Sequence, residues 1–420
     1  MSNGFQSTSQ SILIEGARCF DGLKLLAHPV DVLVKDGKIE WVGSGSMPQD
    51  ARRIRAGNRL LMPGLIDCHV HLEGAVAPDR LNYVTRTTPT LMAFYAAHNA
   101  RLTLEAGFTT LRNLGYCTMG EVATQVSVAL RQAIERGLVE GPRIVVGSVV
   151  DRAGGHFDMM RPPMFARQAD ETADGEAAVR QLVRRHVRAG TDFIKFAVTG
   201  GIASEGDDPD WVMYSEAEIA ALVDESRSMK RRTSCHAYRS EGINRALRAG
   251  IDTLEHGAFM DDEGLDLLVT NKTCLIPTLS FFHGVVTRGR ELNLPASWLE
   301  KCGPAYEAQK KTVRKVRMAG GRIALGTDAA GGRNNPHGDN AKELKLWVDL
   351  GFTPEQVLAA ATSVAAAAIG VGEITGRIAP GYSADLLLVD GDPLQDLSVL
   401  SDKHNIKRVI CRGRSVVERE

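Results

Sequence analysis

Residues 62–74 have the sequence MPGLIDCHVHLEG, and the organisation of the chain can be worked out from this segment. A Pro-Gly pair interrupts the chain, a short apolar run follows, and His69 and His71 stand at the end of that run. Alternate residues of a strand point to the same side, so both imidazoles can face one metal ion. A single His-x-His pattern also fits two surface histidines, and the rest of the chain must decide between these interpretations.

Apolar strands alternate with longer amphipathic stretches through residues 62–375, which is typical of parallel β/α units. The predicted strands are Leu65–Val70, Phe108–Arg112, Arg143–Val149, Asp192–Val198, Thr233–Ala237, Ile251–His256, Thr273–Leu279 and Arg322–Thr327. The predicted helices include Thr90–Ala106, Val122–Arg136, Glu171–Arg188 and Ser215–Arg231. Gly107, Gly190 and Gly250 stand where helices should end, just before a strand. Eight such units predict an α/β fold, a (β/α)8 TIM barrel with its active site at the C-terminal strand ends.

Both ends of the chain have a different sequence pattern, which predicts short strands separated by turns. The predicted strands there are Ser11–Ile14, Val30–Lys35, Ile39–Val42, Ala384–Val389 and Ile406–Cys411. The segment DGK at 36–38 indicates a hairpin between two of them. We therefore expect residues 1–61 and 376–420 to form one small β-sandwich domain beside the barrel.

Composition excludes several classes of protein. The chain has 420 residues, of which 44% are hydrophobic and 24% charged, and a formal net charge of -1. No basic run favours nucleic acid, and no apolar run reaches the roughly 18 residues of a membrane span. The seven cysteines show no CxxC pairing, and the first ten residues, MSNGFQSTSQ, lack the features of a signal peptide. These observations predict a cytoplasmic protein without nucleic-acid or membrane partners.

Six polar side chains stand at or near the C-terminal ends of the predicted barrel strands. They are His69, His71, Lys195, His236, His256 and Asp328. The middle of a barrel strand must be apolar to fill the core, so independent placement would rarely put all six at one rim. The set predicts a metal site, although each histidine alone could be a core residue and Asp328 alone could be a helix N-cap.

Lys195 is the only cation in the apolar segment 192–198. An unpaired buried ammonium is costly, whereas carboxylation of the amine by carbon dioxide would give an anionic oxygen ligand able to bridge two divalent ions. Pairing with a carboxylate and a role as a Schiff-base nucleophile are the alternatives. Asp328, delivered by a strand into a glycine-rich loop, could both bind a metal and accept a proton from water.

These residues carry a resemblance to a known superfamily. The chain resembles the amidohydrolases over nearly its whole length, through residues 63–71 (PGLIDCHVH) and 326–328 (GTD). Lys195 followed by TGG at 199–201, then HAY at 236–238, EHG at 255–257 and HGDN at 337–340, looks like one binuclear branch of that superfamily. This branch contains imidodipeptidases, carboxypeptidases cleaving before Arg or Lys, and ochratoxin-type amide hydrolases.

The resemblance implies a division of roles. His69 and His71 would hold the more buried metal with Asp328, His236 and His256 would hold the more exposed one, and carboxylated Lys195 would bridge them. A hydroxide between the metals would attack the amide carbonyl, while Asp328 would carry its proton to the leaving amine. Nitrogen and carboxylate ligands make zinc the expected metal.

His156 and Tyr238 match positions where this branch contacts the scissile carbonyl or the substrate carboxylate, so both are predicted as catalytic residues with Asp328. A loop histidine and a core-edge aromatic residue are the alternatives. At Asn113 the chain departs from relatives that often have an aspartate there, which puts a supporting role at that position in doubt.

We therefore expect a binuclear amide hydrolase that acts on dipeptides or N-acyl amino acids, including ochratoxin A, and that forms a homo-oligomer. A cyclic amidase, a mononuclear deaminase and a non-catalytic assembly protein of the same fold are the alternatives. Six residues near the predicted loops are candidates for binding the substrate carboxylate by charge-assisted hydrogen bonds. They are Arg112, Arg152, Arg161, Arg239, His283 and Arg333.

Overall fold

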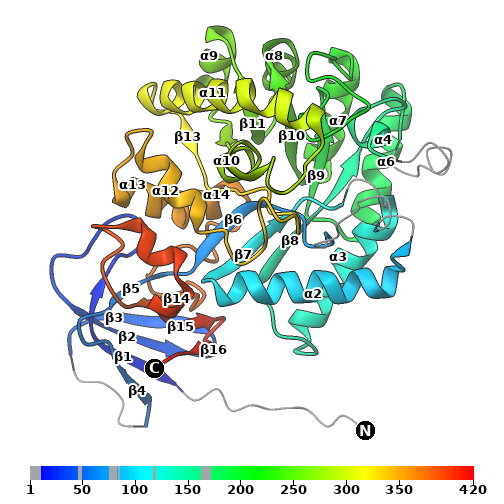
Figure 1. The fold of residues 1–420 in the computed structure, drawn as a ribbon. Coiled ribbons are helices and arrows are strands. Elements are labelled where there is room, and N and C mark those ends of the chain that lie inside the picture. The colour runs from blue at the N-terminus through cyan, green and yellow to red at the C-terminus, as the bar shows by residue number, and fades with distance from the viewer. Residues whose placement is uncertain (1–10, 46–49, 75–82, 84–85, 117–119, 162–171) are drawn as a thin grey trace, which may run out of the picture.

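The computed structural model describes residues 11–45, 50–74, 83, 86–116, 120–161 and 172–420. The segment MSNGFQSTSQ, Cys117 and the first residue of the predicted helix Glu171–Arg188 lie outside the described residues. Within the described part, the helices surround a curled parallel sheet, and a second sheet containing both ends of the chain lies to one side of it (Figure 1).

The parallel sheet has eight strands in the order β13-β12-β11-β10-β9-β8-β7-β6, so that neighbours in sequence are neighbours in space. Its strands are β6 Leu65–Val70, β7 Phe108–Asn113, β8 Arg143–Val150, β9 Phe193–Ala197, β10 Arg232–Arg239, β11 Thr253–Phe259, β12 Cys274–Ile276 and β13 Arg322–Ile323. All eight predicted strands are present, and the α/β class with a parallel eight-stranded sheet is confirmed.

The two ends of this sheet meet at the strand that carries His69. Cys68 N donates to Leu325 O at 2.9 Å, Asp328 N donates to His69 O at 2.7 Å, and His71 N donates to Ala329 O at 2.8 Å. The segment after β13 therefore runs beside β6. The predicted strand Arg322–Thr327 is shorter than expected because the chain leaves regular strand geometry after Ile323.

The helices of the described residues cover the outside of the parallel sheet (Figure 1). They are α2 Pro89–Glu105, α3 Gly120–Glu135, α4 His156–Met159, α6 Glu176–Ala189, α7 Glu216–Ser228, α8 Ser240–Ala249, α9 Asp262–Asn271, α10 Leu279–Arg288, α11 Ala296–Met318, α12 Lys342–Val348, α13 Pro354–Ala360 and α14 Ser363–Ala368. Gly190 and Gly250 end α6 and α8 in the left-handed conformation, as predicted. Two short 3-10 helices, Leu397–Ser401 and Lys403–Asn405, precede the last strands.

The second sheet joins both ends of the chain in the order β16-β15-β14-β5-β1-β2-β3, with β4 beside β1. Its strands are β1 Ile12–Cys19, β2 Val30–Lys35, β3 Lys38–Gly43, β4 Arg52–Arg55, β5 Leu60–Pro63, β14 Leu386–Val389, β15 Ile406–Cys411 and β16 Arg414–Glu418. The sequence did not predict β4, β5 or β16. In β4, three arginines flank one isoleucine and hide the alternation, while β5 is a continuous apolar run that merges with β6.

Gly64 is the point at which the chain passes from the second sheet to the parallel sheet. Met62 and Pro63 pair with β14, Gly64 N donates to Asp385 O at 2.8 Å, and β6 begins at Leu65. A Cβ on Gly64 would overlap the side chain of Thr109 in β7, so only glycine allows this close approach. The Pro-Gly pair therefore sets the register of the strand that carries the two histidines.

A search of the helices in the described residues finds none that is both long enough and apolar enough to span a membrane.

Candidate metal centre

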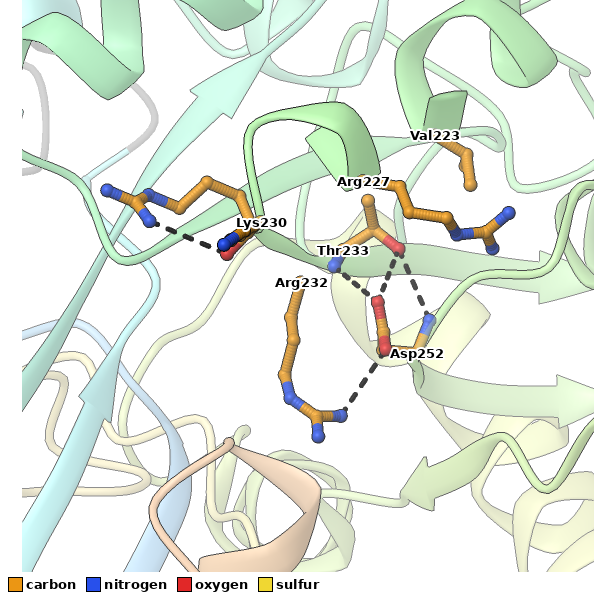
Figure 2. A pocket seen from close by; sticks show the side chains of 7 residues that line it. Val223, Arg227, Lys230, Arg232, Thr233 and Asp252 are labelled. Carbon is orange, nitrogen blue, oxygen red and sulfur yellow. Dashed lines mark hydrogen bonds and ion pairs between the residues drawn. The ribbon is translucent and has the colours of Figure 1, made fainter. Parts of the chain in front are cut away.

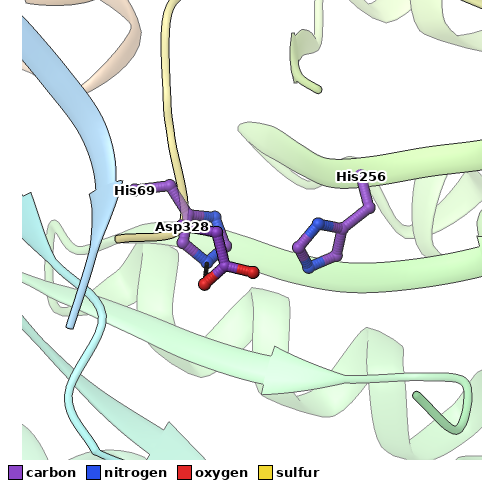
Figure 3. A group of neighbouring side chains, drawn as sticks. All are labelled: His69, His256 and Asp328. Atoms are coloured by element: carbon purple, nitrogen blue, oxygen red, sulfur yellow. Dashed lines mark ion pairs between the residues drawn. The ribbon is translucent and has the colours of Figure 1, made fainter. Parts of the chain in front are cut away.

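Three predicted ligands, from β6, β11 and the segment after β13, converge at the C-terminal ends of the parallel sheet. One ligand atom each from His69, His256 and Asp328 lies within 4.8 Å of the others. Figure 3 shows both imidazole rings directed toward the Asp328 carboxylate. Asp328 Oδ1 is 3.1 Å from His71 Nε2 and 3.5 Å from His69 Nε2, so the His-x-His pair and the distant aspartate belong to one site.

The remaining predicted histidines extend this group in a continuous row of rings. The His69 ring centroid lies 5.4 Å from that of His71 and 5.2 Å from that of His256. His236 follows, 4.8 Å from His256, and His156 stacks on His236 at 4.3 Å. Burial lowers the pKa of His69 to about 4 and holds the pKa of His236 and His256 well below the usual histidine value, which leaves neutral imidazoles with a lone pair for a metal ion.

Lys195 lies in β9, and its side chain is buried. Its Nζ atom has no hydrogen-bond partner in the described part of the chain. Burial is the largest cause of a lowered pKa, about 8, so roughly one tenth of this lysine is an uncharged amine at pH 7, a far larger share than for an ordinary lysine. Pairing with a carboxylate, one of the alternatives from the sequence, is not seen among the described residues. A neutral buried amine without a partner fits the predicted carboxylation.

Hydrogen bonds on the outer side of three histidines fix which nitrogen faces the site. The Nδ1 of His69 is 2.8 Å from Glu255 Oε2, and the Nδ1 of His256 is 2.8 Å from Thr278 Oγ1. The Nδ1 of His71 contacts the carbonyl oxygen of Gly115. Each Nε2 is thereby left for the centre, the arrangement found around metal-binding histidines. His236 differs, because its Nε2 is 3.4 Å from Gly200 O.

Glu255, which contacts His69, is held in place by a buried network of hydrogen bonds. Its Oε1 accepts hydrogen bonds from Arg112 at 2.7 Å, Thr253 at 2.6 Å and Ser234 at 2.8 Å. Burial raises the pKa of Glu255, but Arg112 and His69 outweigh burial and hold it well below its usual value. The prediction that Arg112 could bind the substrate carboxylate is therefore wrong, because this side chain is buried and pairs with Glu255.

Asp328 is placed by a second network centred on Asp67. Asp67 accepts hydrogen bonds from His69 N at 3.0 Å, Thr327 Oγ1 at 2.6 Å and Asn340 Nδ2 at 2.8 Å. Asn340 belongs to the HGDN segment noted in the sequence. Asp328 itself adopts a left-handed backbone conformation with φ 59°, which is uncommon away from glycine and directs its carboxylate toward the histidines.

His156 and Tyr238 both lie against the row of histidine rings. His156 begins α4 and places its Nδ1 2.6 Å from Asp207 Oδ2. Tyr238, in β10, stacks on the His256 ring with centroids 4.9 Å apart, and its backbone N donates to Thr199 Oγ1 at 3.0 Å. No sequence signal marks Asp207, which lies in a polar loop among other acidic residues.

Asn113 supports the chain that follows His71. Its Nδ2 donates to Glu73 Oε1 at 2.7 Å and to Ser127 Oγ at 2.9 Å, and its Oδ1 accepts from Leu72 N at 3.0 Å. An aspartate could not make both donations. The departure noted in the sequence therefore matches the local hydrogen bonding.

The other candidates for binding a substrate carboxylate differ in the partners that their side chains already have. Arg239 pairs with Asp210, and Arg152 donates to Met213 O. His283 is exposed and its Nδ1 is 3.3 Å from Tyr306 Oη. Arg333 is exposed and its guanidinium pairs with no acid among the described residues. Arg161 is buried beside Asp158.

A separate basic pocket of about 220 Å³ lies at the opposite, N-terminal ends of β10 and β11. Its three arginines are already engaged. Arg227 donates to Gly250 O and Arg231 to Thr191 O, while Arg232 pairs with Asp252. In Figure 2 the guanidinium groups of Arg227 and Arg232 extend in different directions. The pocket does not have the convergent donors of an anion site, so the histidine centre is kept as the candidate functional site.

Polar groups that converge at the C-terminal ends of a curled parallel sheet stand where enzymes of the β/α-barrel kind have their active sites. A model of the amidohydrolase family matches residues 60–416, and the chain belongs to this family. The ochratoxinase of Aspergillus niger is 30% identical over 410 residues, which cover 91% of this chain and 82% of that protein. The imidazolonepropionase of Cereibacter sphaeroides is 26% identical over 401 residues, covering 90% and 92%.

Solved structures agree with the family assignment. A crystal structure of a Xaa-Pro dipeptidase with bound methionine in its active site superposes with a TM-score of 0.86 and 28% identity, covering 97% of this chain and all of that one. The family and these relatives support an amide hydrolase.

Proposed function

We propose that this chain is a metal-dependent hydrolase that cleaves the amide bond of N-acyl or aminoacyl amino acids with a free carboxylate. The convergence of His69, His256 and Asp328 within 4.8 Å carries the proposal, because nitrogen and carboxylate donors of this kind suit a divalent ion such as zinc. The similarity to an ochratoxinase and to a Xaa-Pro dipeptidase supports this substrate class.

In the proposed site, His69, His71 and Asp328 would hold one ion, and His236 and His256 would hold a second. Carboxylated Lys195 would supply the anionic oxygen ligand that they share. The orphaned Lys195 amine supports this assignment, since its burial without a partner is otherwise costly. Divalent ions bound there would lower the pKa of a water molecule and polarise the amide carbonyl.

The chain's own groups would then move the proton and orient the amide. Asp328 accepts a proton from the attacking water and passes it to the leaving amine. Its second carboxylate oxygen, Oδ2, bonds to none of the described residues, while Oδ1 faces His71. Tyr238 and His156, which contact the row of histidine rings, orient the substrate carbonyl.

We also propose that the terminal strands, from 1–61 and 376–420, form a β-sandwich domain distinct from the barrel at 62–375. The protein would act as a homo-oligomer on small-molecule or dipeptide substrates. Continuous strand pairing between β5 and β14 supports a domain that contains both ends of the chain.

The decisive experiment compares free-acid substrates with their C-terminal amides. We expect the zinc-loaded enzyme to hydrolyse dipeptides or N-acyl amino acids with C-terminal Phe, Arg, Lys or Pro, with ochratoxin A as an N-acyl-phenylalanine probe. Amidation of the carboxylate should lower kcat/KM roughly 10- to 150-fold, since a hydrogen bond to a charged group contributes about 1.5–3 kcal/mol.

A matched panel of cyclic amides, including an imidazolone, tests the alternative that similarity to an imidazolonepropionase raises. Equal cleavage of acids and amides, or reaction with cyclic amides alone, would replace the proposed substrate class by the cyclic-amidase one.

A further inference from the structure

The position of His156 depends on a loop from a different part of the chain. His156 follows β8, whereas residues 199–211 follow β9. The His156 ring lies against the His236 ring, with centroids 4.3 Å apart and planes at 17°. Gly201 lies against the ring at Cε1, because a Cβ on this glycine would overlap that atom. The stacked His236 ring and the glycine therefore form a close-fitting slot for this imidazole.

Asp207 closes the slot at the Nδ1 end. Its Oδ2 is 2.6 Å from His156 Nδ1 and accepts from Gly201 N at 2.8 Å, and its Oδ1 accepts from Ser204 Oγ. The carboxylate is fully buried, so these donors stabilise it. With Nδ1 engaged, Nε2 is the nitrogen left for a substrate, and it bonds to no residue that the structure describes.

Lys301, in α11, forms hydrogen bonds with the backbone of the same loop. Its Nζ donates to three backbone carbonyl oxygens, those of Asp207 at 2.7 Å, Ser204 at 3.0 Å and Gly201 at 3.4 Å. One ammonium thus satisfies three carbonyls of a turn that regular secondary structure leaves unpaired. We call Asp207 and Lys301 together the loop clamp.

We infer that the loop clamp is a positioning device: ion-paired with the Asp207 carboxylate, His156 acts as an imidazolium whose Nε2–H is fixed to donate to the scissile carbonyl oxygen. This inference rests on the proposed amide hydrolysis. Two residues that touch neither the proposed ligands nor the substrate would then control the chemical step through His156. Because a carbonyl contact strengthens as the oxygen gains charge, loss of the clamp should appear mainly in kcat and little in KM.

The test is a double-mutant cycle on the zinc-loaded full-length protein. The variants are Asp207→Ala, His156→Ala and their combination, with Asp207→Asn as the conservative change. Asp208→Ala is the matched control, because Asp208 is exposed in the same loop and caps only Asp210 N. Lys301→Met is paired with Lys311→Met, a change at an exposed position of the same helix.

We expect Asp207→Ala and His156→Ala each to lower kcat about 10- to 100-fold, with zinc content and Tm near the wild type. Asp207→Asn should retain part of the activity, since its amide oxygen can still accept from Nδ1. Lys301→Met should lower kcat in the same direction as Asp207→Ala, and neither control should change it. In the His156→Ala background, Asp207→Ala should cause no further loss.

Independent losses that multiply in the double variant would overturn the positioning role, as would an equal loss in Asp208→Ala. If Asp207→Ala fails to fold, the same cycle is read from Asp207→Asn and Lys301→Met. If the wild type hydrolyses amides but the losses multiply in the double variant, only the positioning role of the loop clamp is ruled out, and the proposed function stands. A zinc-loaded wild type that cleaves no amide would remove the proposed function and the clamp's role with it.

Discussion

Asp328 and Lys195 contribute opposite kinds of group to the same centre. Burial tends to raise the pKa of the Asp328 carboxyl, but His69 and His71 outweigh it and keep the group ionised. Lys195 has no such partner, and burial favours its neutral form. One residue is therefore poised to accept a proton, and the other to be modified into a ligand.

This contrast gives a prediction for single substitutions. Asp328→Asn should retain substrate binding and lose most turnover, about 100-fold or more, because an amide cannot accept the proton. Lys195→Ala should instead lower metal occupancy, and short carboxylic acids should partly restore it by occupying the space of the carbamate. Elemental analysis and steady-state kinetics on the same samples distinguish the two effects. Equal metal loss with unchanged turnover in both variants would contradict these roles.

For individual residues, the sequence predicted the side chains that face the site but not the hydrogen-bond partners that position them. His69, His236, His256 and Asp328 each end an apolar run, which is a local signal. Asp207 has no such signal, because its contact with His156 joins residues 51 positions apart. The availability of Arg112 was predicted wrongly for the same reason, since its partner Glu255 is 143 positions away.

The start of α10 shows how an element supports the site. Thr278 precedes this helix in a left-handed conformation, with φ 54°, which is a true outlier for a β-branched residue. Buried Glu343, in α12, accepts from Leu279 N at 3.1 Å and Ser280 N at 2.5 Å and so satisfies the first turn of α10. The strained Thr278 thereby keeps its Oγ1 2.8 Å from His256 Nδ1.

We expect Thr278→Val, which keeps the shape but removes the hydroxyl, to weaken zinc retention about 10- to 100-fold, as loss of a supporting hydrogen bond to a ligand does. Thr278→Ser keeps the hydroxyl and should behave like the wild type. Competition with a chromogenic chelator measures zinc release directly, and thermal unfolding checks that the fold persists. Similar release from both variants would show that the hydroxyl does not position His256.

Local patterns determined most elements, and long-range pairing determined the rest. The predicted bounds of β2, β6 and β15 match the structure, because each is an apolar segment bounded by turn residues. β5 was missed because it continues directly into β6 through Gly64, and only its pairing with β14 separates the two. The β13 strand is shorter than predicted because Asp328 and its neighbours bond to β6 instead.

On the scale of the whole molecule, Asp385 links the two sheets. It is buried and accepts hydrogen bonds from Arg143 in β8 at 3.2 Å and from Arg412 N at 2.7 Å, while its carbonyl accepts from Gly64 N. The start of β6 is therefore fixed by the terminal strands. The centre in turn draws on β6, β9, β10, β11 and the segment after β13, so bound metal would connect distant parts of the barrel.

Metal removal should consequently destabilise the whole protein as well as abolish hydrolysis. We expect a metal-replete sample to contain about two divalent ions per chain, mainly zinc. Each ion should stabilise the folded state by about 3–4 kcal/mol at free concentrations 100- to 1,000-fold above its Kd. Chelation should therefore lower Tm, and zinc should restore both Tm and activity. Elemental analysis with differential scanning calorimetry measures both quantities.

Lys195→Ala provides the matched comparison, because a chain that binds less metal should show a smaller Tm shift on chelation. A reproducible content near one ion per chain would remove the argument for a bridging carbamate. An unchanged Tm after complete removal would show that the ligand-bearing strand ends are held without metal by networks such as that of Glu255, whose oxygens bond Arg112 and His69. The centre would then be preorganised by the fold, and its metal would serve the chemistry alone.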